Sequence, residues 1–236
     1  QLDASYTSLV GLTFQCGFTT VTANQEVVQI NSVNDATDIW GCNVINCTFD
    51  GSRSAGASNA ADADLDFLRI GLDSSDRAYR SLVQGCTLFA CDQDAIAIPS
   101  ASAIGTVIRN CNIYDGVASE LTRYCVSAAG VGTLVEDCDL TVADTATPGA
   151  GVYVNSTIVR TAGNRIWARG ADTTAILAAA SATMSGMGNV LTAVAAGNLT
   201  DYLTDNTSPS ADCNFKGIFA AVPGAAAFET PTVAGL

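Results

Sequence analysis

One phrase recurs along the chain and constrains its fold more than any other feature. Two β-branched or aliphatic residues are followed by one or two polar or small residues, a cysteine, a polar residue and another apolar residue. The clearest copies surround Cys47, Cys86, Cys111 and Cys138, which lie 39, 25 and 27 residues apart. Each copy alternates apolar and polar residues, which is typical of a strand with one buried face.

The segments between these copies contain further short strands, joined by turns rich in Gly, Asn, Asp and Ser. Each repeat of about 25 residues therefore holds two or three strands, which is the content of one coil of a parallel β-helix. Equivalent residues of successive coils would stack about 4.8 Å apart along its axis. The additional strand-like segments are residues 27–30, 65–70, 95–98, 124–127 and 151–154.

Two of the copies, VIRNCNI at residues 107–113 and LVEDCDL at residues 134–140, resemble coils of right-handed parallel β-helix proteins. That superfamily includes pectate-lyase-like enzymes, phage tailspikes and other virion β-helices. The resemblance covers roughly residues 9–191 and implies an all-β fold, a right-handed single-stranded parallel β-helix of about six to seven coils. It says much less about function, because one fold supports many functions.

The repeat ends near residue 203, so we expect residues 1–203 to form the β-helix and residues 204–236 to form a C-terminal cap or an extended assembly arm. A solenoid has an open edge at each end, and a terminus that folds over the last coil would cover one of them. Alternatively, the arm would insert Phe219 or Phe228 into a neighbouring subunit. The sequence leaves these two roles open.

The repeated cysteines occupy one position in successive coils, so we expect them to form an interior ladder of small, apolar thiols. The alternative, a soft-metal or redox site, requires close pairs in a polar, accessible setting. Cys42 with Cys47, and Cys86 with Cys91, are offset by five residues, which is not the spacing of a zinc knuckle. The buried ladder is therefore favoured. Cys213 lies outside the repeats and is the expected unpaired thiol of the nine.

Composition excludes several classes of function. The chain has no histidine, which removes Ser-His-Asp and Cys-His nucleophile systems and His-ligated metals. Ten basic and 23 acidic residues give a net charge of −13, without a basic stripe for phosphates or an anionic bilayer. We therefore expect neither nucleic acid nor a membrane as a partner, and no cofactor. Any catalysis would depend on carboxylates, arginines or tyrosines.

Carboxylates that follow the repeated phrases are the candidate catalytic groups. Stacked along one edge, they would lie near 5 or 10 Å apart, the separations of retaining and inverting glycoside hydrolysis. Turn formation and solubility explain them more simply, because Asp-Gly pairs favour turns and a soluble solenoid needs surface charge. The residues are Asp50, Asp92, Asp94, Asp115 and Asp144, of which Asp92, Asp94 and Asp115 would be catalytic if the chain is an enzyme.

Asp62, Asp64 and Asp66 alternate along the chain and would share one face of an extended segment. Clustered carboxylate oxygens suit calcium, which makes these three residues candidate calcium ligands. No EF-hand spacing follows them, so the pattern favours the absence of a metal site.

Two functions are compatible with these features. The first is a non-catalytic structural protein of a phage or similar virion: a capsid decoration, head fibre or tail component. It would be a homotrimer, located in the virion and contacting other virion or capsid proteins. Its support is the resemblance of the coils, the missing catalytic constellation and the alanine-rich arm.

The alternative is a secreted or extracellular β-helix that binds or cleaves carbohydrate, like tailspike-type glycoside hydrolases or polysaccharide lyases. Surface glycans would then be its partners. Aromatic residues make up only 7% of the chain, and Trp40 and Trp167 are the two tryptophans. That is thin for a long glycan groove, so the structural role is favoured.

Overall fold

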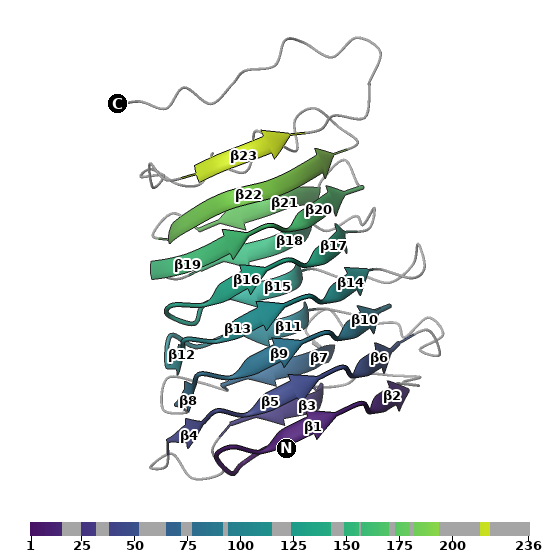
Figure 1. The fold of residues 1–236 in the computed structure, drawn as a ribbon, viewed down its shortest axis with the longest axis vertical. Helices are drawn as coiled ribbons and strands as arrows, with labels where there is room; N and C mark the ends of the chain where they lie inside the picture. Colours follow the sequence, from purple (N-terminus) through teal and green to yellow (C-terminus); the bar gives the residue numbers. More distant parts are fainter. Residues whose placement is uncertain are drawn as a thin grey trace.

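The computed structural model describes residues 1–15, 25–31, 38–51, 65–71, 77–91, 94–114, 124–142, 149–155, 157–169, 173–179, 182–193 and 213–217. Within these ranges the regular elements are strands, and all of the paired strands run parallel. The coils stack into a tall solenoid (Figure 1). The predicted all-β parallel solenoid is confirmed. No helix in these ranges is long and apolar enough to cross a membrane.

The largest sheet has fourteen strands and is folded into two arms that meet in one long strand, β22 (Thr183–Ala193). Successive coils add one strand to each arm. The first arm contains β1 (Ser8–Val10), β5 (Asn43–Ile45), β9 (Leu82–Gln84), β13 (Val107–Arg109), β16 (Leu134–Glu136) and β19 (Thr157–Ala162), then the first half of β22. The second arm contains β2 (Thr13–Gln15), β6 (Thr48–Asp50), β10 (Thr87–Phe89), β14 (Asn112–Tyr114), β17 (Asp139–Val142) and β20 (Arg165–Ala168), then the second half of β22.

Two further sheets complete the coils. The six-stranded sheet contains β3 (Gln25–Ile30), β7 (Leu65–Ile70), β11 (Asp94–Ile98), β15 (Tyr124–Ala128), β18 (Gly149–Val154) and β21 (Thr173–Ala178). The three-stranded sheet contains β4 (Ile39–Trp40), β8 (Ala78–Tyr79) and β12 (Ala103–Ile104). Within the predicted C-terminal arm, β23 (Cys213–Gly217) pairs with β22, whereas Phe219 and Phe228 lie outside the described residues.

The bend between the two arms depends on a residue with positive φ just before each repeated cysteine. Asn46, Gly85, Asn110, Asp137 and Gly163 have φ between 53° and 64°. Each donates its main-chain N–H to a carbonyl of the next coil, at 2.8 to 3.1 Å. Gly, Asn and Asp adopt this conformation at the lowest cost. The small or polar residues of the repeated phrase are therefore required by the backbone.

Side chains on neighbouring bends also fit one another. The Oδ1 atom of Asn46 lies 2.3 Å from the position that a Cβ on Gly85 would take, and Asp137 approaches Gly163 in the same way. A side chain on either glycine would collide with its neighbour. This packing explains why Gly follows Asn or Asp on the next coil at Gly85 and Gly163.

The interior is filled by stacked aliphatic side chains, one for each coil and sheet. Those of the first arm, second arm and six-stranded sheet are almost completely buried, as the period-two pattern predicts. Near the N-terminal end, the ring of Phe49 stacks on Phe14 and Phe67 with centroid distances of 4.9 and 5.8 Å. The stacked apolar residues include Val44, Val83, Ile108 and Val135, then Phe49, Leu88, Ile113 and Leu140, then Leu68, Ile96, Val126 and Val152.

Candidate functional site

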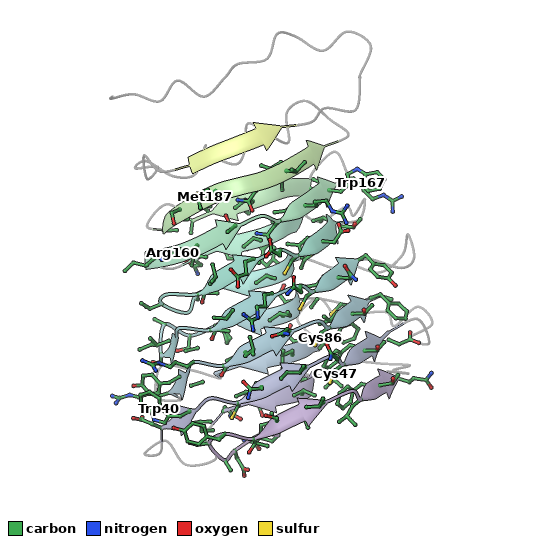
Figure 2. All side chains as sticks on the ribbon, viewed as in Figure 1. Trp40, Cys47, Cys86, Arg160, Trp167 and Met187 are labelled. Carbon is green, nitrogen blue, oxygen red and sulfur yellow. The ribbon has the colours of Figure 1, made fainter. Side chains whose placement is uncertain are left out.

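The repeated cysteines lie inside the solenoid at the bend between the two arms. Cys47, Cys86, Cys111 and Cys138 are each at most 2% exposed and form no disulfide. The predicted interior ladder is confirmed. Figure 2 shows Cys47 and Cys86 on successive coils, within the stack.

Each of these thiols is directed at a main-chain carbonyl of the preceding coil. The Sγ–O distance is 3.7 Å from Cys47 to Leu9 and 3.5 Å from Cys86 to Val44. The corresponding contacts of the next two thiols are 3.8 Å each. The ladder is therefore hydrogen-bonded through weak S–H donors, in addition to being packed.

The ladder continues as asparagine in two looser copies of the repeated phrase, GNRI at residues 163–166 and GNVL at residues 188–191. Asn164 follows Cys138 by 26 residues, and Asn189 follows Asn164 by 25. The Nδ2 atom of Asn164 donates to the carbonyl of Val135 at 2.9 Å, and that of Asn189 donates to the carbonyl of Thr161 at 3.1 Å. The repeat spacing and the glycine before each asparagine mark Asn164 and Asn189 as the ladder position of their coils.

Cys86 and Cys111 are poorly suited to nucleophilic or metal chemistry, which requires the thiolate, whereas the hydrogen bond with Cys111 lowers the pKa of Cys138 despite its burial. The hydrogen bond with Cys138 and burial raise the pKa of Cys111 to about 12, against an opposing contact from Cys86. The hydrogen bond with Cys111, together with burial, raises the pKa of Cys86 as well. Within the described part of the chain, no group of three or more His, Cys, Asp or Glu side chains is arranged to hold a metal ion.

Several predicted site residues lie outside the described residues: Asp62, Asp64, Asp92, Asp115 and Asp144. Asp50 and Asp94, the two described residues of the predicted aspartate edge, do not lie along a common edge of the solenoid. Asp50 ends β6 in the second arm, whereas Asp94 begins β11 in the six-stranded sheet. The prediction of a single edge is therefore wrong for these two. They are separated because the chain changes sheets between them.

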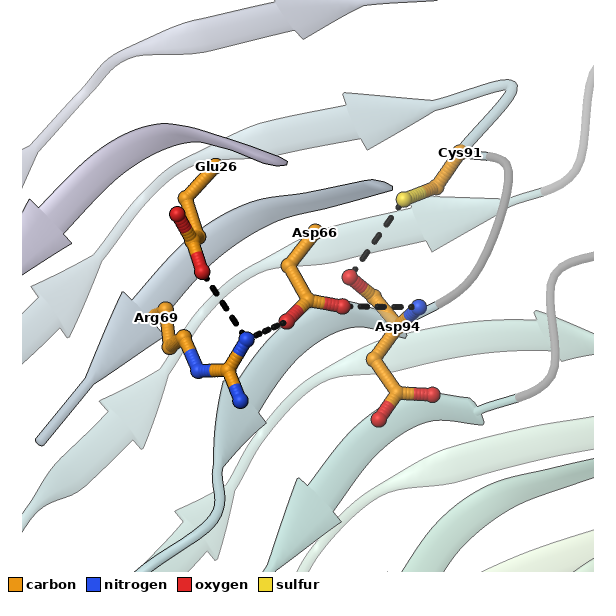
Figure 3. A network of polar contacts seen from close by, with 5 residues as sticks. All are labelled: Glu26, Asp66, Arg69, Cys91 and Asp94. Atoms are coloured by element: carbon orange, nitrogen blue, oxygen red, sulfur yellow. Dashed lines mark hydrogen bonds and ion pairs between the residues drawn. The ribbon is translucent and has the colours of Figure 1, made fainter. Parts of the chain in front are cut away.

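Asp94 lies instead beside Asp66, a residue predicted for a different site. The main-chain N–H of Asp94 donates to Oδ1 of Asp66 at 3.3 Å. Nη1 of Arg69 lies 2.8 Å from Oε1 of Glu26 and 3.4 Å from Oδ2 of Asp66. Cys91 donates its Sγ–H to the main-chain carbonyl of Asp94 at 3.3 Å. Figure 3 shows this network across the neighbouring strands β3, β7 and β11.

The geometry of this network favours a structural role over the two predicted chemical ones. The Asp66 side chain is only 6% exposed and is engaged by Arg69 and a main-chain N–H. A glycoside hydrolase needs two carboxylates that both face the substrate. The guanidinium of Arg69 also supplies the positive charge that a calcium ion would otherwise contribute. The Asp66 carboxylate therefore stabilises the start of its strand, and Asp94 joins the network through its main chain.

An open pocket lies on the outer side of the second arm, around Trp167. It has a volume of about 350 Å³ and is lined by Asp139, Arg165, Ile166, Trp167 and Val190. Arg165 forms an ion pair with Asp139. The Trp167 ring is 47% exposed and projects from the end of β20 (Figure 2). This pocket is at the small end of the range for ligand sites.

An outward row of residues leads to this pocket along the second arm. Phe89, Tyr114, Thr141 and Trp167 are in register on successive coils. The rings of Phe89 and Tyr114 stack with a centroid distance of 5.5 Å and an interplanar angle of 7°. Arg169 places its guanidinium carbon 5.4 Å from the Trp167 ring centroid. Phe89, Tyr114 and Trp167 each follow a ladder residue by three positions. This spacing, and not the number of aromatic residues, is the sequence signal that could have identified the row.

Comparison with known proteins finds no matching family model, no similar curated protein and no similar solved structure. The fold class is therefore shown by the structure, whereas the pectate-lyase-like and phage resemblances remain hypotheses.

Replacing Arg69 with methionine should lower the free energy of unfolding by about 3 kcal/mol, because Asp66 would stay buried without its positive partner. The matched control is Arg77→Met, which removes an exposed ion pair with Asp38 and should cost less than about 1 kcal/mol. Chemical denaturation measures both changes. Equal losses would contradict the structural role. Adding Asp66→Asn to Arg69→Met should restore part of the stability, because the amide is uncharged.

Stability should fall as the pH rises from about 9 to about 12, because Cys111 ionises in the unfolded chain near its ordinary pKa of 9.0 but stays protonated when folded. One such thiol contributes a slope of about 1.4 kcal/mol per pH unit. Cys111→Ser keeps a hydrogen-bond donor and does not titrate there, so its slope should be shallower by up to that amount. Urea denaturation across this range measures it. Identical slopes would rule the effect out.

Proposed function

We propose that this chain is a non-catalytic structural subunit of a virion, acting as a capsid decoration, head fibre or tail component, and that it assembles as a homotrimer. The virion setting and the trimer rest on the resemblance of the coil motifs. Support for a non-catalytic role comes from Asp66, whose carboxylate is engaged by Arg69 and by the main-chain N–H of Asp94.

One observation carries the assembly part of this proposal. Nine large hydrophobic side chains of the described residues are exposed, and six of them lie along one side of the solenoid. Scattered exposed hydrophobics are ordinary in a monomer, but a concentration on one side is typical of an interaction surface. The six are Tyr6, Val10, Trp40, Ile104, Ile158 and Met187.

Native mass spectrometry and light scattering should therefore give a mass three times that of the 24.1 kDa chain. The trimer should persist at micromolar concentration if it is the working form, because a subunit interface stabilises the folded chain by mass action. A monomer at these concentrations would overturn the proposal. A dimer would retain self-assembly but refute the trimer.

A second candidate function, carbohydrate binding, is favoured by the Trp167 pocket. The apolar face of a sugar ring packs against an exposed aromatic ring, and Trp167 offers such a ring. Arg165 and Asp139 supply hydrogen-bond donors and acceptors for hydroxyl groups at the same place. Tyr114 and Phe89 extend the aromatic surface along the solenoid. This candidate requires binding only, without cleavage.

Fluorescence titration tests the binding function, since the chain has two tryptophans. In a Trp40→Phe background, Trp167 becomes the single reporter for oligosaccharides prepared from bacterial capsules and O-antigens. Binding should change its emission, and Trp167→Ala should weaken affinity, measured by calorimetry, by about tenfold or more. The matched control is Trp40→Ala, which should leave affinity unchanged. No binding across the glycan set, or equal affinity in Trp167→Ala, would eliminate this candidate.

A further inference from the structure

The side of the solenoid that carries the six exposed hydrophobic residues is here called the apolar face. It consists of the outer side chains of the three-stranded sheet and its corner, with those of the first arm. Trp40 and Met187 mark its two ends, and Trp167 lies on the other side of the molecule (Figure 2). Because its exposed hydrophobics come from coils at both ends of the stack, the apolar face follows the solenoid axis.

Stacked side chains lie between these exposed residues along the solenoid axis. The rings of Trp40 and Tyr79 stack with centroids 4.3 Å apart and an interplanar angle of 14°. On the first arm, Leu82, Val107 and Leu134 are in register on three successive coils and are partly buried. These two parts of the apolar face are therefore apolar ladders, whereas the column that joins Val10 to Met187 also contains Gln84, Arg109 and Glu136.

The charge of the apolar face differs from that of the whole chain. The described segments that form it, residues 5–11, 38–46, 77–85, 103–110, 131–137, 157–163 and 183–188, contain four arginines and three acidic residues. The chain as a whole has a net charge of −13. A second copy could approach this side without the repulsion that a net acidic surface would produce.

Unpaired charges on the apolar face have both signs. Arg109 and Glu136 occupy one column on neighbouring coils. Arg109 donates Nε and Nη2 to Oε1 of Gln84, at 2.9 and 2.7 Å. Within the described residues, neither Arg109 nor Glu136 has an ion-pair partner. Both are therefore available to a charged group of another copy.

We propose that the apolar face packs against neighbouring copies of this chain, aligned side by side with their axes parallel. This inference rests on the proposed homotrimer and assigns its contact surface. The distance between successive coils is the same in every copy, so the side-chain ladders of adjacent copies match along their full length. A cyclic trimer makes all three solenoids parallel, which keeps this match.

The size of the apolar face sets the area that each contact of such a trimer can bury. Seven first-arm rungs spaced about 4.8 Å apart give a height of about 29 Å. With a width of about 17 Å, the flat area is on the order of 500 Å² per copy, or about 1,500 Å² for the three copies of a trimer. Each copy divides its face between two neighbours, so one contact buries about 500 Å², and the trimer depends on three such contacts that form together.

The first experiment places charge on the apolar face. Ile104→Glu combined with Met187→Glu should weaken self-association by at least about tenfold, because like charges would meet across the interface. Sedimentation equilibrium over a dilution series measures the constant. The matched control is Tyr114→Glu on the second arm, since Tyr114 and Ile104 are 42% and 40% exposed. Circular dichroism confirms that each variant keeps its β-structure.

The second experiment uses the two tryptophans as opposite reporters. In Trp167→Phe, the emission of Trp40 should shift to the red on dilution, because dissociation exposes it. In Trp40→Phe, the emission of Trp167 should not change. This measurement does not depend on the folding of a charged variant.

The outcomes separate this inference from the proposed function. An oligomer that is unaffected by Ile104→Glu with Met187→Glu, or one in which Trp167 responds to dilution and Trp40 does not, overturns the apolar face as the interface while the assembly proposal stands. A chain that is monomeric at all concentrations overturns both. Weakening confined to the double variant, together with the Trp40 response, supports both.

Discussion

Main-chain hydrogen bonds between successive coils are the interaction on which the rest of this structure depends. They keep equivalent residues about 4.8 Å apart, and all side-chain ladders have this spacing. The bend between the two arms is the most demanding point, because its residues need positive φ and also donate to the next coil. At that bend the described coils have Asn, Asp or Gly, the residue types that tolerate the conformation.

Inside the solenoid, the same register creates a position that needs a small side chain with a hydrogen-bond donor. A thiol meets the requirement in Cys86 and Cys111, and an amide meets it in Asn164 and Asn189. The amides bind more strongly and form a connected network, whereas the thiols fill space and donate weakly. The residue type changes along the axis while the carbonyl that it satisfies stays equivalent.

Outside the solenoid, each face has its own chemistry. The six-stranded sheet carries the network around Arg69, the second arm carries the aromatic row that ends at Trp167, and the remaining side carries the apolar face. The described residues contain nine acidic and eight basic residues, so most of the net charge of −13 belongs to segments outside them. The stacked coils are close to neutral, which is compatible with close packing of copies.

The repeating coil, its parallel strands and its buried cysteine ladder are predictable from the amino-acid sequence, because a period-two pattern that recurs at intervals of 25 residues or more leaves few other ways to bury the apolar residues. The sequence did not predict that Asp66 meets Asp94, or that Trp167 lines a pocket with Asp139. Which outward side chains become neighbours depends on the tertiary structure. These residues are separated by 26 to 28 positions, and pairing between coils sets their register. Alternation along a strand tells whether a side chain faces inward or outward, but it does not tell which residue of another coil lies beside it.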